Sequence, residues 1–502
     1  MDYFINCNTS PLTPYTPPLD SSRVAHLYRR LGFSASVQTI DQATGQTANT
    51  LVNNLIAEAQ NMPPLPAPPW ANWNNSNYPA DRDESNEIKR TQEATWRIAY
   101  TDALLNNNLR DRLSFFWSNH LVTQLEVYRC NQFLYEYIDC LQRNALGNFK
   151  TMVHEIGLSS AMLYYLDGAY SNGNNPNENY ARELFELFTM GEGNGYTEED
   201  IIETAKALTG YVNRGEIGCT KVTFDASKFN NDQKTIFGRT GNWGYDDVLD
   251  ILFEERANEI GYFICKKLYE FFIHPDVTDE ATNAQSIING LSATFITNNF
   301  ELAPVVSQLF KSQHFFDENA LGVIIKSPFD MFLNLMNETS FSYDDSMLST
   351  VEEACRLLGQ EVFNPYDVNG WQRNRTWINT NFMIGRWLTS EMVLQKFYGA
   401  QQEEFRDFAM AAVGENNRNT SNPRIVVEAI VNKILPKGLL TEQDFNNAMD
   451  VFMIEEVPDN YYGADFIEGG NGYWILSVSP EVPSQVYFLL LHLVRQPEFQ
   501  LK

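Results

Sequence analysis

The sequence predicts an all-α protein: a large multi-helical body with long irregular loops and at most a few short strands. Apolar residues recur at helical spacing along most of the 502 residues. Runs of β-branched residues with alternating polarity are few and short. The stretches that lack helical spacing are rich in Pro, Asn and Gly, which favour turns and loops.

The N-terminal region is predicted to be an extended leader followed by a first helix. Proline cannot donate a backbone hydrogen bond or continue a helix, and the first twenty residues contain Pro11, Pro14, Pro17 and Pro18. We therefore expect a Pro-rich leader within residues 1–25 and a helix that begins near Ser21 and ends before Gly32. Residues 26–500 are expected to form a single large helical domain.

Three segments interrupt the helical pattern inside that domain. Residues 62–79 form a Pro- and Asn-rich connecting segment. Its two tryptophans, Trp70 and Trp73, predict that it packs against the body of the protein. Irregular loops are expected near residues 211–245 and 363–377.

The first of these irregular loops holds two distinct features. Residues 221–224, Lys-Val-Thr-Phe, form a candidate strand. Residues 238–244 are rich in Gly, but they lack the GxxxxGK[ST] spacing of a phosphate-binding loop, and no strong strand precedes them. We interpret them as a tight loop between helices.

Charge and hydropathy exclude several classes of function. The formal net charge of −28 repels phosphate backbones and anionic lipid surfaces, so nucleic acid is not an expected partner. Cationic substrates, metal ions and neutral glycans remain compatible with that charge. No apolar stretch is long enough to span a membrane, and the N-terminus lacks the pattern of a signal peptide. As it stands the sequence predicts a cytoplasmic protein, or an exported one if a signal has been removed or an atypical route is used.

The cysteines and histidines do not form a recognisable metal or disulfide motif. Six cysteines are present without a CxxC pair, and the six histidines lack HExxH spacing. Cys130 and Cys140 lie in one helical stretch, about 15 Å apart along the axis, which is too far for a disulfide. We therefore expect small core cysteines, no disulfide framework, no metal site and no cofactor.

Residues 177–191 are the most informative segment. At helical spacing, its aromatic and aliphatic side chains fall on one arc, and Glu178, Arg182 and Glu186 form a column on the opposite arc, with Glu183 beside it. Gly191 is placed to end the helix. A capping pattern at Thr197 then predicts a second helix, so the two helices should form a hairpin.

The charged column has two interpretations. Fixed carboxylates oriented by an arginine are suited to general acid–base chemistry or to a metal. Alternatively, the column is a solvated helix face with two ion pairs, each worth about 0.2–0.5 kcal/mol. His120 also has two interpretations, because it falls within the apolar stripe of the preceding helix. It is either a core histidine with satisfied hydrogen bonds or a base that lines a cleft.

Several segments in one order resemble the large bacterial family called domain of unknown function 1800. They include HLYRRLGF at residues 26–33, FWSNH at 116–120, YLDG at 165–168, NENYAREL at 177–184, and NPYDVNGW at 364–371. The resemblance implies a helical, often exported protein that is encoded beside a sulfatase-like partner. Many members have His at the positions of Ser118 and Phe188, so any metal chemistry those histidines support would be absent here.

The resemblance also implies that polar positions of these segments carry function. We therefore hypothesise a hydrolase or transferase that acts on an envelope-associated or glycan substrate. Its catalytic residues would be Glu183, Glu186 and His120, and its substrate-binding residues would be Arg182, Asp167, Asn177 and Asn179. The alternative is a non-catalytic binding or scaffold protein that works with a sulfatase-like partner. The oligomeric state is not predicted.

Overall fold

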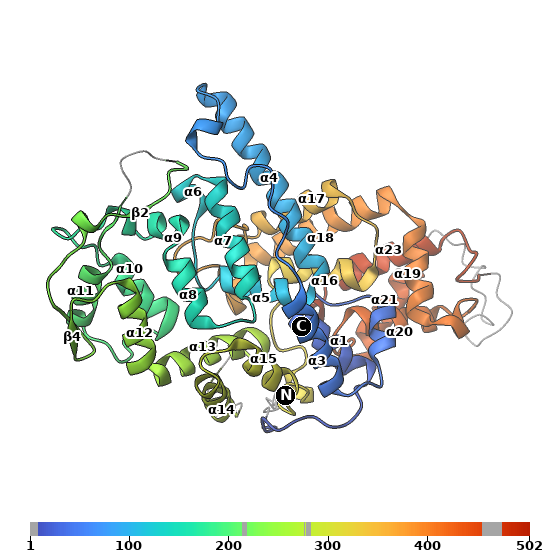
Figure 1. Cartoon of the computed structure of the whole chain (residues 1–502). Coiled ribbons are helices and arrows are strands. Elements are labelled where there is room, and N and C mark those ends of the chain that lie inside the picture. The colour runs from blue at the N-terminus through green and yellow to red at the C-terminus, as the bar shows by residue number, and fades with distance from the viewer. Residues whose placement is uncertain (1–8, 213–217, 276, 278–282, 454–473) are drawn as a thin grey trace. The chain divides into compact units, whose positions relative to one another are not determined.

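α-Helices dominate the computed structural model, which describes residues 9–212, 218–275, 277, 283–453 and 474–502 (Figure 1). Strands are confined, in these ranges, to two small antiparallel sheets. The predicted all-α class is therefore confirmed. No helix within the described ranges is both long enough and apolar enough to cross a membrane.

Contacts between residues divide the chain into two compact units, and each unit is assembled from three separate stretches. Unit 1 comprises the residues up to Pro14, residues 52–315 and residues 361–371. Unit 2 comprises residues 15–51, 316–360 and 372–502. The loop 361–371 is therefore part of unit 1 although both of its flanks belong to unit 2.

Unit 1 is built around amphipathic helices whose apolar faces form its core. Trp117, Leu134, Phe149 and Phe185 are among its fully buried side chains. Its α-helices are α3 (Ala48–Asn61, which begins in unit 2), α4 (Arg82–Asn106), α5 (Asn108–Ser118), α6 (Leu125–Tyr128), α7 (Asn131–Asn144), α8 (Phe149–Gly157), α9 (Ser160–Tyr165), α10 (Asn179–Glu183), α11 (Glu198–Ala207), α12 (Tyr245–Glu255), α13 (Ala257–Phe272), α14 (Ala284–Thr297) and α15 (Leu302–Phe310). Short 3₁₀ turns are η1 (Asn75–Asn77), η2 (Gly168–Tyr170) and η4 (Ala226–Lys228), and η3 (Leu184–Thr189) is a π-helix.

Both small sheets lie in the predicted irregular segment of unit 1. Strand β2 (Thr223–Phe224) confirms the candidate strand and pairs with β1 (Tyr211–Val212). Strands β3 (Lys234–Ile236) and β4 (Arg239–Gly241) form a hairpin. The interpretation of residues 238–244 as a loop between helices was therefore wrong in its first half.

Unit 2 contains the first helix and the C-terminal helices. The predicted helix from Ser21 to the residue before Gly32 is confirmed as α1 (Ser21–Leu31), capped by the Asp20 side chain. The other α-helices are α2 (Val37–Ala43), α16 (Pro328–Thr339), α17 (Asp345–Leu357), α18 (Thr380–Ala400), α19 (Glu403–Val413), α20 (Pro423–Ile434), α21 (Glu442–Phe452) and α23 (Val482–Leu493). Its 3₁₀ turns are η5 (Glu318–Ala320), η6 (Asn374–Ile378), η7 (Glu415–Asn417) and η8 (Pro497–Gln500).

Buried ion pairs hold α16 in the core of unit 2. The Arg29 Nε donates to Glu338 Oε1 over 2.6 Å, and both side chains are at most 5% exposed. The Lys502 ammonium pairs with Asp330 over 2.7 Å. Since breaking a buried pair leaves a stranded charge, these residues have a structural role.

The connecting segment 62–79 packs against unit 1, as predicted. Trp70 is 6% exposed, and its ring meets that of Trp96 edge to face at 5.8 Å. Asn74 and Asn77 form a capping box around η1. The segment is thus an ordered part of the surface of unit 1.

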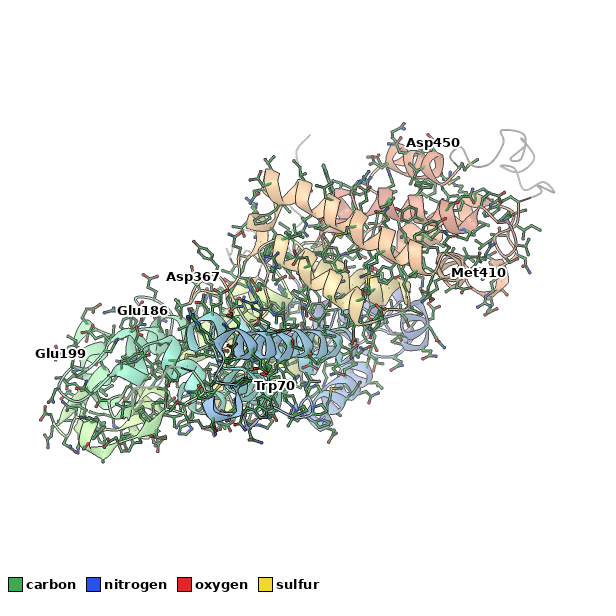
Figure 2. All side chains as sticks on the ribbon, turned by 90° about the horizontal axis from the view of Figure 1, so that it is seen from above. Trp70, Glu186, Glu199, Asp367, Met410 and Asp450 are labelled. Carbon is green, nitrogen blue, oxygen red and sulfur yellow. A yellow bond between two sulfur atoms is a disulfide. The ribbon has the colours of Figure 1, made fainter. Side chains whose placement is uncertain are left out.

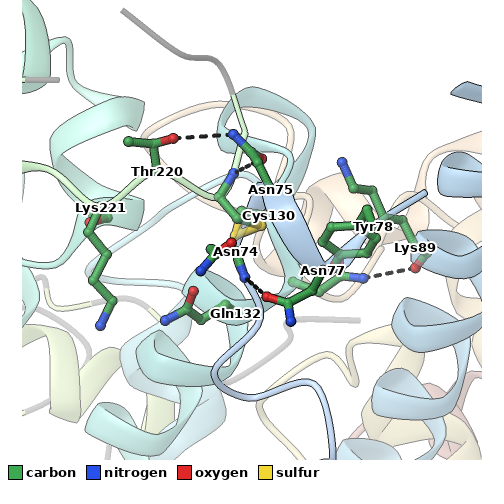
Figure 3. Close-up of a disulfide and its surroundings, with 12 residues drawn as sticks. Asn74, Asn75, Asn77, Tyr78, Lys89, Cys130, Gln132, Thr220 and Lys221 are labelled. Carbon is green, nitrogen blue, oxygen red and sulfur yellow. Dashed lines mark hydrogen bonds between the residues drawn. A yellow bond between two sulfur atoms is a disulfide. The ribbon is translucent and has the colours of Figure 1, made fainter. Parts of the chain in front are cut away.

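Cys130 and Cys219 form a disulfide, which corrects the prediction that the cysteines are isolated core residues (Figure 3). Their Cα atoms lie 5.0 Å apart although 89 positions separate them in the chain. The side chain of Asn75 supports the bridge by accepting a hydrogen bond from the Cys219 N–H at 2.9 Å. Cys140, Cys265 and Cys355 are buried and free, as expected, and Cys7 lies outside the described residues.

Candidate functional site

The segment 177–191 folds as an α-helix that changes into a π-helix. Helix α10 ends at Glu183, and the π-helix η3 continues to Thr189. Its wider turns are visible in the bond from the Met190 N–H to the Phe185 carbonyl, and Gly191, at φ +95°, ends the segment as predicted. The expectation of one regular α-helix was therefore wrong at its C-terminal half. Such π-helical turns occur frequently at functional sites.

The predicted charged column forms and gains a fourth member. Arg182 pairs with Glu178 at 3.4 Å and with Glu186 at 3.3 Å, and it reaches Glu198 on α11 at 2.8 Å. The predicted hairpin is confirmed, with the Thr197 cap and Asp200 forming a capping box at the start of α11. Arg182 is one third exposed, so the column is neither buried nor fully solvated.

Glu183 lies beside this column in a less polar environment. Partial burial raises the pKa of its carboxyl, the neighbouring Glu186 also raises it, and Arg182 lowers it, so that the pKa rises from 4.5 to about 7 in all. Among the residues that the structure describes, none donates a hydrogen bond to the Glu183 carboxyl. A carboxyl of this kind can exchange a proton near neutral pH.

Glu186 is held from two sides. Its Oε1 accepts hydrogen bonds from Arg182 at 3.3 Å and from the Tyr196 hydroxyl at 2.8 Å. The Tyr196 oxygen in turn accepts from the Gly193 N–H at 2.8 Å. The Glu186 side chain is 19% exposed, so these bonds hold it in a fixed position one turn away from Glu183.

Two residues that the sequence analysis did not single out complete the cluster. Tyr165 ends α9 and is partly buried, and burial raises the pKa of its hydroxyl, with further increases from the nearby Asp367 and Glu183. Asp367 comes from the loop 361–371, and its carboxylate acts on the Tyr165 hydroxyl, as that of Glu183 does; Asp367 and Glu186 are both labelled in Figure 2. Both residues fall in segments of the family resemblance, which was the only signal that could have found them.

The loop 361–371 is fixed to α5 and α6 by backbone and side-chain contacts. The Trp371 N–H donates to Asn119 Oδ1 at 2.6 Å, and the Trp371 ring stacks on Phe115 at 4.9 Å. Gly370 has φ +85° and crosses Asn119 so closely that a Cβ would lie 2.2 Å from its Oδ1. The loop therefore presents Asp367 on a rigid support.

His120 lies in the aromatic core of unit 1. It is 5% exposed, and its ring packs near those of Phe116 and Trp117. Its Nε2 contacts the Phe188 carbonyl of the π-helix at 2.9 Å. His120 thus touches the segment that carries Glu186 through the backbone.

The three remaining candidates are Asp167, Asn177 and Asn179, which precede α10 in the chain or begin it. Asp167 is exposed at φ +60° and begins the turn η2. Asn177 Oδ1 accepts the N–H of Asn179 at 2.9 Å, a local turn that leads into the helix. Their substrate-binding role stays a prediction.

Tyr180 has a packing role within the segment 177–191, which we call the signature segment and whose helical part is the signature helix. Its hydroxyl lies 3.1 Å from that of Tyr245, and a Cβ on Gly157 would lie 1.8 Å from the Tyr180 oxygen. Helix α8 and the signature helix can approach this closely only with glycine at position 157. Not every polar signature position is therefore available for chemistry.

The family model for proteins of unknown function called DUF1800 matches residues 26–501, so the chain belongs to that family. The family's activity is not known. No curated protein and no solved structure matches the chain. Across the described ranges, no group of three His, Cys, Asp or Glu side chains is arranged to hold a metal ion.

Proposed function

We propose that this protein is an enzyme, a hydrolase or transferase acting on a glycan or envelope-associated substrate, in which Glu183 is the general acid–base. The observation that carries this proposal is the pKa of Glu183, raised by burial to about 7. A catalytic acid works best when its pKa is near the working pH. Paired carboxyls in unlike environments are the usual arrangement for cleaving glycosidic bonds.

The chemistry needs a proton donor and a second carboxylate. Protonated Glu183 would donate its proton to the leaving oxygen as the bond from that oxygen to the substrate carbon breaks. Water, or an acceptor hydroxyl in a transferase, would add to that carbon and lose its proton to a carboxylate. Glu186, three residues further along the same segment, and Asp367 on the loop 361–371 are the two candidates for this base.

Arg182 and His120 take positioning roles in this proposal. The donors of Arg182 are directed at Glu178, Glu186 and Glu198, which suits it to orient Glu186 better than to bind an anionic substrate. The bond between His120 and the Phe188 carbonyl supports the π-helical turn that carries Glu186. We therefore replace the catalytic role predicted for His120 with a positioning role.

The test is release of reducing ends from a panel of polysaccharides, with the wild type beside Glu183→Gln and Glu199→Gln. Glu199 is an exposed carboxylate on α11, so it is the matched control. We expect the wild type to cleave at least one polymer, Glu183→Gln to lose about 10²-fold or more in kcat, and Glu199→Gln to match the wild type. Equal rates for Glu183→Gln and the wild type would contradict the proposal.

A second candidate function is a non-catalytic scaffold that works with a sulfatase-like partner protein. The observation that favours it is that Arg182 and His120 are both engaged by groups of their own chain. Under this alternative no polymer is cleaved, and co-purification of the two proteins would be unaffected by Glu183→Gln.

We also propose that the protein works outside the reducing cytoplasm. The Cys130–Cys219 disulfide supports this location, because stable disulfides are rare in the cytosol. Alkylation of unreduced protein taken from its native compartment tests the location. Protection of these two thiols is expected, and their free alkylation would place the protein in the cytoplasm.

A further inference from the structure

Tyr366 is an aromatic side chain that folding leaves almost wholly in solvent. It is 86% exposed, more than any other large hydrophobic residue of the described ranges. A ring this exposed gains little from the hydrophobic effect in the folded protein. Single exposed apolar residues are common on surfaces, so its meaning depends on its support and its neighbours.

The support of Tyr366 is rigid on both sides. Before it, the Leu125 N–H donates to the Phe363 carbonyl at 3.0 Å, and Gln124 donates to the Pro365 carbonyl at 2.5 Å. After it, Asp367 Oδ1 accepts the Asn369 N–H at 2.8 Å. Pro365 itself is buried. The backbone of Tyr366 is therefore fixed, which lowers the entropy lost when a ligand contacts the ring.

The residue that follows Tyr366 in the chain, Asp367, is one of the two candidates for the catalytic base. The adjacent residue, Asp367, shares the surroundings of the Tyr165 hydroxyl with Glu183. An exposed ring on a fixed loop is thus adjacent in the chain to a carboxylate that can accept hydroxyl hydrogens. That carboxylate acts on the same tyrosine, Tyr165, as a carboxyl that can donate a proton. This combination suits a ligand with one apolar face and a polar edge.

We propose that Tyr366 is a stacking platform for one pyranose ring of an uncharged glycan, held so that the adjoining glycosidic bond reaches Glu183. The C–H face of a pyranose fits the negative face of an aromatic ring, and its hydroxyls fit Asp367. The adjacent Asp367 carboxylate and the formal net charge of −28 repel sulfated, phosphorylated or uronic acid sugars. This inference rests on the proposed function and names its substrate class.

Binding is measured by calorimetry with cellohexaose and chitohexaose as uncharged probes and oligogalacturonate as the charged one. The variants are Tyr366→Ala, Tyr366→Phe and, as a control, Tyr343→Ala, which removes another exposed tyrosine in unit 2. We expect binding of an uncharged probe to weaken about tenfold in Tyr366→Ala. Tyr366→Phe keeps the ring and should bind within about twofold of the wild type, as should Tyr343→Ala.

Several results would overturn the platform. They are wild-type affinity in Tyr366→Ala, equal losses in the Ala and Phe variants, no binding of either uncharged probe, and tighter binding of oligogalacturonate. A protein partner lost on Tyr366→Ala without any glycan binding would show that the ring is a protein contact, which also overturns the proposal. The melting temperatures of the two Tyr366 variants are expected to match the wild type, because the Tyr366 ring is exposed.

The Glu183→Gln variant separates the two proposals. If it stops turnover while Tyr366→Ala changes neither affinity nor KM, the platform fails and the proposed function stands. If Tyr366→Ala weakens binding while Glu183→Gln leaves turnover unchanged, the glycan site stands and the role of Glu183 fails.

Discussion

Arg182 and Glu183 are adjacent in the chain, but their side chains lie in different electrostatic environments. Arg182 is surrounded by three carboxylates, and the bond to Glu198 and the other pairs raise the pKa of its guanidinium. Glu183 is partly buried against the body of unit 1, and burial raises the pKa of its carboxyl to about 7. One residue is therefore charged at every physiological pH, whereas its neighbour titrates within the physiological range.

Titration of Glu183 makes the stability of the protein depend on pH. Because its pKa is higher in the folded state, its contribution is fully present below pH 4.5 and is lost as the pH rises through about 7. The difference between 4.5 and about 7 corresponds to about 3 kcal/mol, and we expect about half of that for a half-exposed group. Glu183→Gln should therefore stabilise the protein by about 1.5 kcal/mol at pH 8 and change little at pH 4.5.

Chemical denaturation at both pH values measures this difference, and Glu199→Gln is the control that should show none. Equal effects of Glu183→Gln at the two pH values would mean that the carboxyl titrates normally. The same variant tests catalysis above, so a gain in stability with a loss of activity would identify a functional carboxyl.

Removal of Arg182 tests whether the charged column contributes to folding. Its partners are part-exposed or exposed, and surface ion pairs contribute little to the free energy of unfolding. We expect Arg182→Gln to cost about 1 kcal/mol, well below the about 3–5 kcal/mol expected for breaking a buried pair such as Arg29 with Glu338. Urea denaturation of Arg182→Gln and Arg29→Gln compares the two, and similar losses would contradict the assignment.

At the scale of elements, the packing of α8 on the signature helix depends on Gly157. A Cβ at this position would lie 1.8 Å from the Tyr180 oxygen and 2.0 Å from the Tyr245 oxygen. We expect Gly157→Ala to destabilise the protein by about 1–3 kcal/mol through overpacking. Gly399→Ala, in an open position on α18, is the control and should be neutral or stabilising. Thermal denaturation checks both, and a neutral Gly157→Ala would show that the two tyrosines can move apart.

Much of the structure of the segment 177–191 could be predicted from residue spacing, and the features that could not be predicted have physical causes. Spacing identified the buried face of the signature segment, its charged column, the Gly191 end and the Thr197 cap. It could not identify the π-helix, because an i to i+5 pattern of bonds over one or two turns scarcely changes which residues are apolar. Nor could it place Asp367 and Glu183 around the same tyrosine, Tyr165, because Asp367 comes from a distant loop of the chain.

The β3–β4 hairpin shows the same limit at a turn. Its two connecting residues, Phe237 and Gly238, have φ +48° and +80°, and positive φ at both positions is required in a type I′ turn. Asn-Gly or Asp-Gly is the sequence signal for that turn, and phenylalanine rarely adopts positive φ. The disulfide joins two cysteines that are 89 positions apart, so no local pattern of residues relates Cys130 to Cys219.

At the scale of the molecule, the Cys130–Cys219 bridge encloses the helices that carry Glu183 and Glu186. For a loop of 89 residues, the chain-entropy model gives about 4–5 kcal/mol of stabilisation, and measured values are usually about 2–5 kcal/mol. We expect Cys130→Ser/Cys219→Ser to lower stability by this amount, and the wild type to lose as much in reducing agent. A variant whose melting temperature equals that of the wild type in both oxidising and reducing buffers would contradict this role.

The two units are interleaved along the chain, and the single domain expected for residues 26–500 stays a prediction. The chain passes between units after Pro14, Leu51, Phe315, Gln360 and Trp371. Neither unit is a continuous piece of chain, and the loop that carries Asp367 belongs to unit 1 between two segments of unit 2. The chain crosses between the units at five points, so the unfolding of one unit would free the ends of segments that belong to the other unit.

We expect this connectivity to make unfolding a single cooperative transition, although the chain is longer than the about 250–300 residues of most single cores. In calorimetry, the van't Hoff and measured enthalpies should agree, as they do for one cooperative unit. Gly157→Ala changes only unit 1, so it should lower the whole transition without splitting it. If the variant instead separates an early transition from one that stays at the wild-type temperature, then unit 2 folds independently and residues 26–500 are two domains.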